Sequence, residues 1–149
     1  MSAPEQRPPL AERVLHLLQA HLDGAELEVR SVPEDETFIT VPAAALPQLV
    51  ALLLEREGLY HLSTLTGLDN GESIELLYHF WQGCGITLRV VLPYDAPHAP
   101  SLTPQIPGAS FYEREVMEML GVVFEGHPHP QRLFLPDDWQ GGWPLRRKQ

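Results

Sequence analysis

The sequence contains one cysteine and no long apolar run, and both shortages exclude whole classes of protein. Cys84 alone cannot form an internal disulfide, and an iron–sulfur cluster typically needs about four thiolates. No apolar stretch reaches the roughly 18 to 20 residues that a membrane-spanning helix requires. The N-terminal residues MSAPEQRPPL also lack the apolar core of a secretory signal. We therefore expect a reduced, cytoplasmic setting without direct membrane insertion.

Basic residues are also scarce, because 10 Lys and Arg stand against 20 Asp and Glu, for a formal net charge of −10. A nucleic-acid partner requires clustered cations that neutralise phosphates, and the only basic cluster is Arg146, Arg147 and Lys148. The glycine patterns that hold a dinucleotide or a nucleotide phosphate are missing as well. We therefore expect no nucleic-acid partner and no nucleotide site in this chain.

What is present is enough apolar sequence for one core, since 44% of the 149 residues are hydrophobic. Apolar residues at helical spacing predict helices over 10–22 and 46–57, the second ended by Gly58. Short β-prone runs between turn residues predict strands over 26–30, 37–41, 59–68, 73–81 and 86–92. We therefore expect an α+β domain over residues 1–93, with helices packed on one face of a mostly antiparallel sheet.

Two further regions follow. Residues 94–109 hold four prolines, which predicts an extended connector. Residues 110–149 form the third region, which begins with Ser110 followed three positions later by Glu113, a pattern typical of a capping box. This pattern predicts a helix over 110–120 that ends at Gly121, with Glu113 and Glu118 among its solvent-facing polar residues.

The segment from Gly121 to Gln149, called the tail from here on, combines features that rarely occur together. It has four glycines and four prolines, which forbid long regular structure, yet it carries nine large apolar side chains, including two tryptophans. Such a segment is too hydrophobic to remain solvated. It must pack either against a partner, where Trp is a common anchor, or against this protein's own sheet. We favour the partner and keep both alternatives.

The order of residues in the last third of the chain is specific. It reads Tyr-Glu-Arg-Glu-Val, then Met, Gly, Phe, Gly-His-Pro, Arg-Leu, Leu-Pro, Asp-Trp and Pro-Leu-Arg. These residues are, in order, Tyr112, Glu113, Arg114, Glu115, Val116, Met119, Gly121, Phe124, Gly126, His127, Pro128, Arg132, Leu133, Leu135, Pro136, Asp138, Trp139, Pro144, Leu145 and Arg146. This run resembles the signature of the 30-kDa subunit family of respiratory complex I. Members are known as the C subunit of bacterial NADH–quinone oxidoreductase and as the J subunit of the plastid and cyanobacterial version.

The resemblance implies a non-catalytic scaffold subunit in the peripheral arm of a proton-translocating NADH–quinone or ferredoxin–quinone oxidoreductase. Such a subunit docks onto the large 49-kDa-type subunit at the quinone site and onto the small iron–sulfur subunit. It lies at the cytoplasmic face of an inner or thylakoid-type membrane. No catalytic, cofactor-binding or metal-binding residue is expected in this chain. The iron–sulfur clusters and quinone, with FMN and NADH in a complete complex, belong to partner subunits.

The same resemblance assigns a set of residues to the partner interface. These expected contact residues all lie in the last region of the chain, and they are Tyr112, Glu113, Arg114, Glu115, Met119, Phe124, His127, Arg132, Leu135, Asp138, Trp139, Trp143, Leu145 and Arg146.

Two alternatives stay open. Membrane-bound energy-converting hydrogenases and formate hydrogenlyases use related subunits, so the chain is alternatively the equivalent subunit of such a complex. The less favoured alternative is a self-contained, metal-dependent small enzyme that uses His127 or His129. Zinc sites need further Cys, His or carboxylate ligands, and alternate residues of an extended segment tend to point in different directions.

Overall fold

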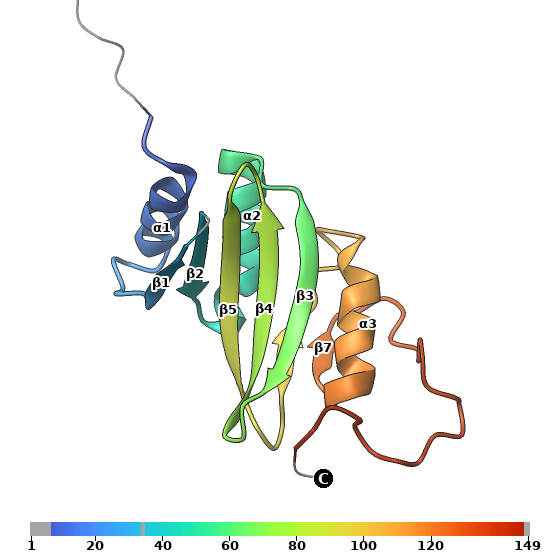
Figure 1. Cartoon of the computed structure of the whole chain (residues 1–149). Helices are drawn as coiled ribbons and strands as arrows, with labels where there is room; N and C mark the ends of the chain where they lie inside the picture. The colour runs from blue at the N-terminus through green and yellow to red at the C-terminus, as the bar shows by residue number, and fades with distance from the viewer. Residues whose placement is uncertain (1–6, 34, 148–149) are drawn as a thin grey trace, which may run out of the picture.

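The computed structural model describes residues 7–33 and 35–147 and shows one sheet of five strands flanked by helices (Figure 1). The elements, in chain order, are α1 (Leu10–His21), β1 (Val29–Val32), β2 (Glu36–Thr40), the 3₁₀ turn η1 (Ala43–Ala45), α2 (Leu46–Glu57), β3 (Leu62–Asp69), β4 (Ser73–Trp81), β5 (Gly85–Pro93), β6 (His98–Pro100), α3 (Ala109–Leu120) and β7 (Val123–Glu125).

The sheet has the order β1-β2-β5-β4-β3, and every neighbouring pair is antiparallel except β2 with β5. Side chains alternate between its two faces, so Leu76, Tyr78 and Phe80 of β4 are buried in the core. Glu75 and His79 lie on the opposite face and bond to side chains of β5. The predicted α+β class and the mostly antiparallel sheet are confirmed.

Helix α3 holds the tail, and a glycine in β3 sets how closely that helix approaches the sheet. A Cβ atom added at Gly67 would lie 2.5 Å from Leu120 Cδ1 and 3.2 Å from Val116 Cγ1, so a larger residue there would force these side chains of α3 to move. Helix α2 lies behind β4 and β5 in Figure 1, whereas α3 lies along the β3 side. The tail therefore starts from a helix that is fixed directly to the sheet.

Most element boundaries agree with the sequence predictions. The helix predicted over 46–57 and the strand predicted over 73–81 match α2 and β4, and Gly58 ends α2 with φ of +61°. The first strand begins at Val29 instead of residue 26, and β3 begins at Leu62 instead of residue 59. Glu34, which lies between the first two predicted strands, is outside the described residues.

The predicted capping box is wrong. Helix α3 already begins at Ala109, with Gly108 as the N-cap residue and no side-chain cap. Glu113 is instead turned into the protein interior, where hydroxyl and backbone donors bind its carboxylate, and the hydroxyl of Ser110 lies 3.3 Å from His127 Nε2. Glu118, expected on the solvent side, is also buried. Both carboxylates bond to segments outside the helix.

The proline-rich segment 94–109 packs against the rest of the chain. Its residues 98–100 form β6, which pairs in parallel with β7 of the tail. Ala99 and Leu102 belong to the same buried cluster as Val122 and Phe124. The hydrophobic core thus runs across the predicted boundaries at 93 and 109, although the three-part division itself stays a prediction. Among the described residues, no helix combines the length and apolar character needed to cross a membrane.

Candidate docking surface

The carboxylate of Glu113 holds the buried side of α3 to the segment before it through hydrogen bonds. It accepts hydrogen bonds from the hydroxyls of Ser101 and Thr103, both at 2.6 Å, and from the backbone N–H of Leu102 at 2.9 Å. Its side chain has no solvent exposure. Hydrogen bonds to a charged acceptor are about twice as strong as neutral ones. Glu113 therefore fixes residues 101–103 against the helix.

Two further polar side chains are buried beside Glu113. Nε2 of His127 lies 3.9 Å from the Glu113 carboxylate, and Nδ1 accepts a 3.0 Å hydrogen bond from the backbone N–H of His129. Because Nδ1 is an acceptor there, Nε2 is the ring nitrogen available to donate, and it lies 3.4 Å from the carbonyl of Ser110. Burial, reinforced by the charge of Glu113, raises the pKa of the Tyr78 hydroxyl well above its usual value. The side chains of Glu113, His127 and Tyr78 are all buried.

Glu118 and Arg114 tie the middle of the tail to the outer side of α3. The Glu118 carboxylate accepts backbone N–H groups from three consecutive residues, Leu133, Phe134 at 2.7 Å and Leu135 at 3.3 Å. The guanidinium of Arg114 donates to the carbonyls of Gln131 and Arg132, each at 3.0 Å. Residues 131–135 are therefore held by both a buried acid and a base of the same helix.

A second anchor holds the far end of the tail. The backbone N–H of Leu145 donates to the carbonyl of Met119 at 2.9 Å. Arg146 donates to the carbonyls of Leu120 and Tyr94, at 3.2 and 2.7 Å, and its guanidinium lies 4.3 Å from the centre of the Tyr94 ring. This geometry adds a cation–π contact to the hydrogen bonds. The tail thus returns to the C-terminal end of α3.

Asp69, the last residue of β3, completes this second anchor. Its carboxylate accepts 2.7 Å hydrogen bonds from the backbone N–H of Arg147 and from the Tyr94 hydroxyl. Burial raises the pKa of Asp69, but these bonds, a further bond from the N–H of Gly71 and the charge of Arg146 together lower it below its usual range. The ionised form of Asp69 is therefore the form that holds the end of the tail.

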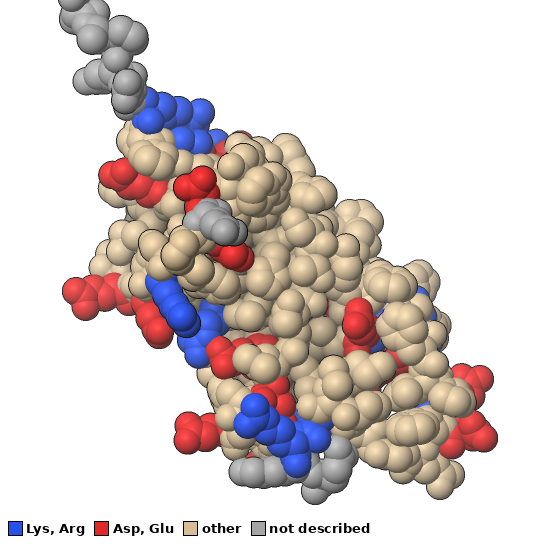
Figure 2. Space-filling view, viewed as in Figure 1, with Lys and Arg blue, Asp and Glu red and all other residues tan. Residues whose placement is uncertain are grey.

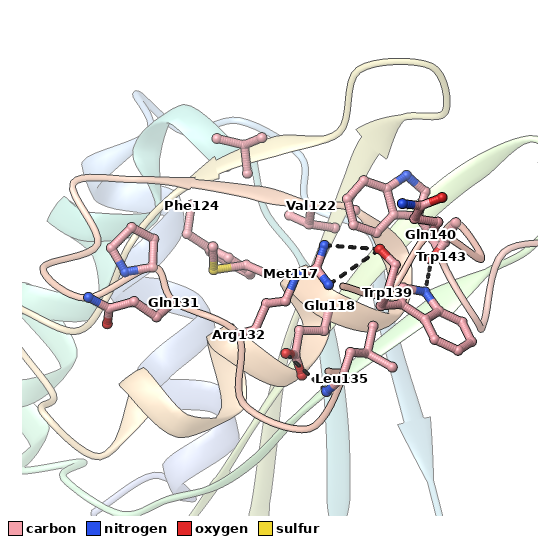
Figure 3. A pocket seen from close by; sticks show the side chains of 14 residues that line it. Met117, Glu118, Val122, Phe124, Gln131, Arg132, Leu135, Trp139, Gln140 and Trp143 are labelled. Atoms are coloured by element: carbon pink, nitrogen blue, oxygen red, sulfur yellow. Dashed lines mark hydrogen bonds between the residues drawn. The ribbon is translucent and has the colours of Figure 1, made fainter. Parts of the chain in front are cut away.

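Between the anchors, residues 136–143 form an arch that stands away from α3 (Figure 1). The guanidinium of Arg132 donates to the carbonyls of Pro136 and Trp139, and Trp139 Nε1 donates to the carbonyl of Gly142 at 2.8 Å (Figure 3). A cleft of about 510 Å³ lies beneath the arch. Its apolar lining includes Met117, Val122, Phe124, Leu135, Trp139 and Trp143.

Large apolar side chains around this cleft remain open to solvent. Trp139 is 38% exposed, Trp143 is 47% exposed, and Phe134 and Phe111 are about half exposed. Phe111 meets Phe134 edge to face, with ring centres 5.8 Å apart. Exposed aromatic groups held in fixed positions are typical of surfaces that bind another protein. The arch, the cleft and these aromatic residues together form the candidate docking surface.

The residues expected at a partner interface fall into three groups, and their assignment to an interface stays a prediction. Glu113, Phe124 and His127 are buried. Tyr112, Arg114, Met119, Leu135 and Arg146 are partly buried, whereas Glu115, Arg132, Asp138, Trp139, Trp143 and Leu145 are exposed. Sequence reasoning missed the anchoring roles of Glu118 and Asp69, because both depend on backbone groups far away in the sequence. Among the described residues, no three His, Cys, Asp or Glu side chains gather in a way that could hold a metal ion.

Comparison with known proteins identifies the family. The family model described as "Respiratory-chain NADH dehydrogenase, 30 Kd subunit" matches residues 39–149, which include most of the sheet and the whole docking surface. The chain belongs to this 30 Kd subunit family. The resemblance seen in the sequence is therefore confirmed, and other subunits of a multisubunit respiratory complex are the partners that membership implies.

Two relatives and one solved structure are similar to this chain, and the two relatives are subunits of different complexes. The C subunit of NADH-quinone oxidoreductase from Moorella thermoacetica is 39% identical over 127 residues, which cover 82% of this chain and 84% of the relative. Formate hydrogenlyase subunit 5 of Escherichia coli K12 is 35% identical over 146 residues, which cover 93% of this chain but 26% of the relative. The structure of a trypsin-resistant fragment of Nqo5 matches with a TM-score of 0.67 and 27% identity, covering 80% of this chain and 98% of the fragment.

Proposed function

We propose that this protein is a non-catalytic scaffold subunit in the peripheral arm of a proton-translocating NADH–quinone or ferredoxin–quinone oxidoreductase. The single observation that carries the proposal is the arch of residues 136–143, which presents Trp139 and Trp143 on a backbone fastened at both ends. Binding to a prearranged surface avoids much of the entropy cost of ordering a flexible tail. The two alternatives for the tail thus combine, since it packs on its own helix and still offers a surface to a partner.

The partners we propose are the large 49-kDa-type subunit and the adjacent small iron–sulfur subunit. Support for a large partner comes from formate hydrogenlyase subunit 5, in which the region similar to this chain makes up about a quarter of the polypeptide. In that protein, a chain like this one is covalently joined to a much longer one. Joining two polypeptides in this way is useful when they act side by side, because it raises their effective concentration.

We further propose that the chain has no active site or cofactor of its own and that the iron–sulfur clusters and quinone lie in its partners. The buried acids support this proposal, because the carboxylates of Glu113 and Glu118 are each engaged by three hydrogen-bond donors. Acids held in this way have little capacity left to exchange protons with a substrate. The proposed location is peripheral, on the cytoplasmic face of the inner or thylakoid-type membrane.

Affinity purification from native membranes tests the proposed function. The tag belongs on the N-terminus, because the first described residues lie at the opposite end of the molecule from the tail (Figure 1). After solubilisation in mild detergent, we expect the tagged chain to carry iron–sulfur and membrane subunits of an NADH–quinone oxidoreductase, identified by mass spectrometry. Recovery of the chain alone, as a soluble monomer, would contradict the scaffold function.

The equivalent role in a membrane-bound energy-converting hydrogenase or formate hydrogenlyase is the second candidate, and the 35% identity to formate hydrogenlyase subunit 5 favours it. The same purification separates the two candidates. A nickel–iron subunit indicates the second complex, its absence among the recovered subunits indicates the first, and subunits that bind NADH indicate the NADH-dependent form of the first.

A further inference from the structure

We infer that the outer edge of β1 is a second binding site, which pairs with an extended segment of another subunit that carries an acid, an apolar residue and a base in that order. This inference rests on the proposed function in one respect, since the segment belongs to a subunit of the same complex. It goes further because the site lies on the opposite side of the sheet from the tail (Figure 1).

The two edges of the five-stranded sheet differ. The strand β3 forms one edge, and helix α3 packs against it, with the Tyr112 hydroxyl donating to the carbonyl of Ser63 at 2.9 Å. The strand β1 forms the other edge. Val29 is 39% exposed there, and Arg30 and Ser31 are exposed as well. Of these two edges, the β1 edge is the one that is open to a further strand.

Backbone hydrogen bonds show which residues of β1 face outward. The N–H of Thr40 in β2 donates to the carbonyl of Glu28 at 2.9 Å. Bonded and non-bonded positions alternate in an antiparallel pair, so every second residue after Glu28, beginning with Arg30, bonds to β2. The N–H and C=O groups of Val29 and Ser31 therefore point away from the sheet. In the part of the chain that the structure describes, no hydrogen bond engages these outward groups.

The regularity of β1 suits the addition of an antiparallel strand. Its four residues pair with β2 in an unbroken register, and the strand contains neither a proline nor a bulge that would block its edge. Strand addition to such an edge is a common mode of peptide recognition. Positions 28 and 30 then become the non-bonded positions of the new pair, where opposite Cα atoms are only about 4.5 Å apart. The side chains at these two positions therefore select the partner.

The charges at these positions define the acid and the base. Glu28 and Arg30 lie two residues apart and share one face of the sheet. The Glu28 side chain is 76% exposed and lies 3.9 Å from Arg89, and among the described residues Arg30 forms no ion pair. Figure 2 shows acidic and basic side chains close together on the left, where β1 lies in Figure 1. An antiparallel segment thus places an acid opposite Arg30 and, two residues later, a base opposite Glu28.

Apolar contacts complete the site. Between the two charged positions, Val29 points to the other face of the sheet, where an apolar residue of the segment covers it. A hollow of about 530 Å³ adjoins the beginning of β1, and its apolar lining includes Leu22, Leu27, Val41 and Pro42. The segment continues past Glu28 toward this hollow, so apolar residues that follow its base gain additional buried surface.

Photo-crosslinking in the assembled complex tests the inference. The photoreactive amino acid p-benzoylphenylalanine replaces Ser31 in the full-length tagged chain, and in a control it replaces Leu68, which is 42% exposed on β3 at the other end of the sheet. After irradiation of native membranes, we expect the label at position 31 to join a peptide of another subunit that contains the order acid, apolar residue, base. The label at position 68 should not reach that peptide.

Two pairs of variants measure the contribution of the edge. Ser31→Pro removes an outward N–H without removing a bond to β2, whereas Ser31→Ala keeps that N–H. We expect the proline to lower the recovery of the crosslinked subunit on the order of tenfold and the alanine to leave it unchanged. Arg30→Glu should likewise lower this recovery more than Arg30→Gln, because it opposes the acid of the segment. Thermal unfolding followed by circular dichroism identifies a variant that fails to fold.

The outcomes separate this inference from the proposed function. If unmodified protein recovers the other subunits but position 31 crosslinks only within its own chain, or to a segment without the acid and the base, the inference is wrong and the scaffold function stands. A crosslink between two copies of this chain also overturns it, since Glu28-Val29-Arg30 has the same order of residues. Equal recovery with folded Ser31→Pro and Ser31→Ala, or with Arg30→Glu and Arg30→Gln, counts against it too. If unmodified protein recovers no subunit, both proposals are wrong.

Discussion

The indole of Trp143 lies directly against the backbone of Gly121. A Cβ atom added at Gly121 would be 2.6 Å from Trp143 Cε2 and 2.7 Å from its Nε1, closer than real Cβ contacts come. Gly121 also ends α3 with φ of +75°, the left-handed conformation that favours glycine. One glycine therefore both terminates the helix and lets the tail close over its end.

Gly121→Ala is accordingly expected to destabilise the tail more than the backbone conformation alone explains. The left-handed conformation costs an alanine about 1 kcal/mol, and displacement of Trp143 adds to this cost. Gly24→Ala is the matched control, because Gly24 has nearly the same φ of +76° and nothing lies within 4 Å of its added Cβ. Tryptophan fluorescence should change for Gly121→Ala only. A similar loss of thermal stability and unchanged fluorescence in both variants would contradict the contact.

Glu113→Gln is expected to destabilise the whole domain. An amide keeps one oxygen for the N–H of Leu102, and its NH₂ group then faces the hydroxyls of Ser101 and Thr103, which must turn to accept instead of donate. The three bonds to a charged acceptor, about 1.5 to 3 kcal/mol each, become neutral bonds of about 0.5 to 1.5 kcal/mol each, so we expect a loss of about 3 kcal/mol in the free energy of unfolding. Urea denaturation measures it, with exposed Glu115→Gln on the same helix as the control. Equal stability of the two variants would show that the carboxylate charge is dispensable.

The two buried acids also show where prediction from the sequence stops. Periodicity and turn residues were enough to predict α2, β4 and the end of α3, because those elements are specified by local sequence. The sequence around Glu113 looked like a capping box, since a pattern of four residues cannot reveal that Ser101 and Thr103 lie opposite. Likewise, Asp69 reads as a turn residue until the fold brings Arg147 to it, 78 positions later. Local patterns predict elements, whereas contacts distant in sequence decide what a polar side chain does.

Glu118→Gln is expected to release the first anchor of the tail without unfolding the domain. The carboxylate accepts the N–H groups of Leu133, Phe134 and Leu135, which immediately follow Arg132, a site for trypsin. Hydrogen bonds to charged groups contribute about 1.5 to 3 kcal/mol, and about 1.4 kcal/mol corresponds to a tenfold change in the open population. We expect cleavage after Arg132 to accelerate at least about tenfold.

Limited proteolysis of the full chain followed by mass spectrometry measures that rate. Glu115→Gln again serves as the control, because it removes an exposed carboxylate from the same helix. Unchanged cleavage at Arg132 in Glu118→Gln would mean that other contacts, such as those of Arg114, hold residues 131–135 without the acid.

Trp139→Ala is expected to weaken assembly while leaving the domain folded. Its indole lines the cleft and is 38% exposed, so truncation removes contact area for the partner more than core packing. We expect a loss of about 2 kcal/mol or more in partner affinity, as at other interface anchors. Trp81→Ala is the control, because Trp81 is 51% exposed at the end of β4. If circular dichroism showed the domain of Trp139→Ala unfolded, Trp139 would belong to the core instead.

The stabilisation that Asp69 provides is expected to decrease as the pH falls into the acid range. Burial opposes ionisation, but the bonds from Arg147, Tyr94 and Gly71 outweigh it and lower the pKa of Asp69 in the folded protein. A carboxyl group whose folded pKa is lower than its unfolded value stabilises the protein above the unfolded pKa, about 3.9. That stabilisation is lost as the pH falls through the folded pKa.

Asp69→Asn should therefore unfold more easily than the unmodified protein at pH 7, and the difference should shrink below about pH 4 as the acid form of Asp69 accumulates. Urea denaturation at a series of pH values measures this difference, and Asp95→Asn, at an exposed residue just after β5, is the control. The same loss of stability at pH 3 and pH 7 would mean that the charge of Asp69 contributes nothing. The second anchor would then depend on the contacts of Leu145 with Met119 and of Arg146 with Leu120 and Tyr94.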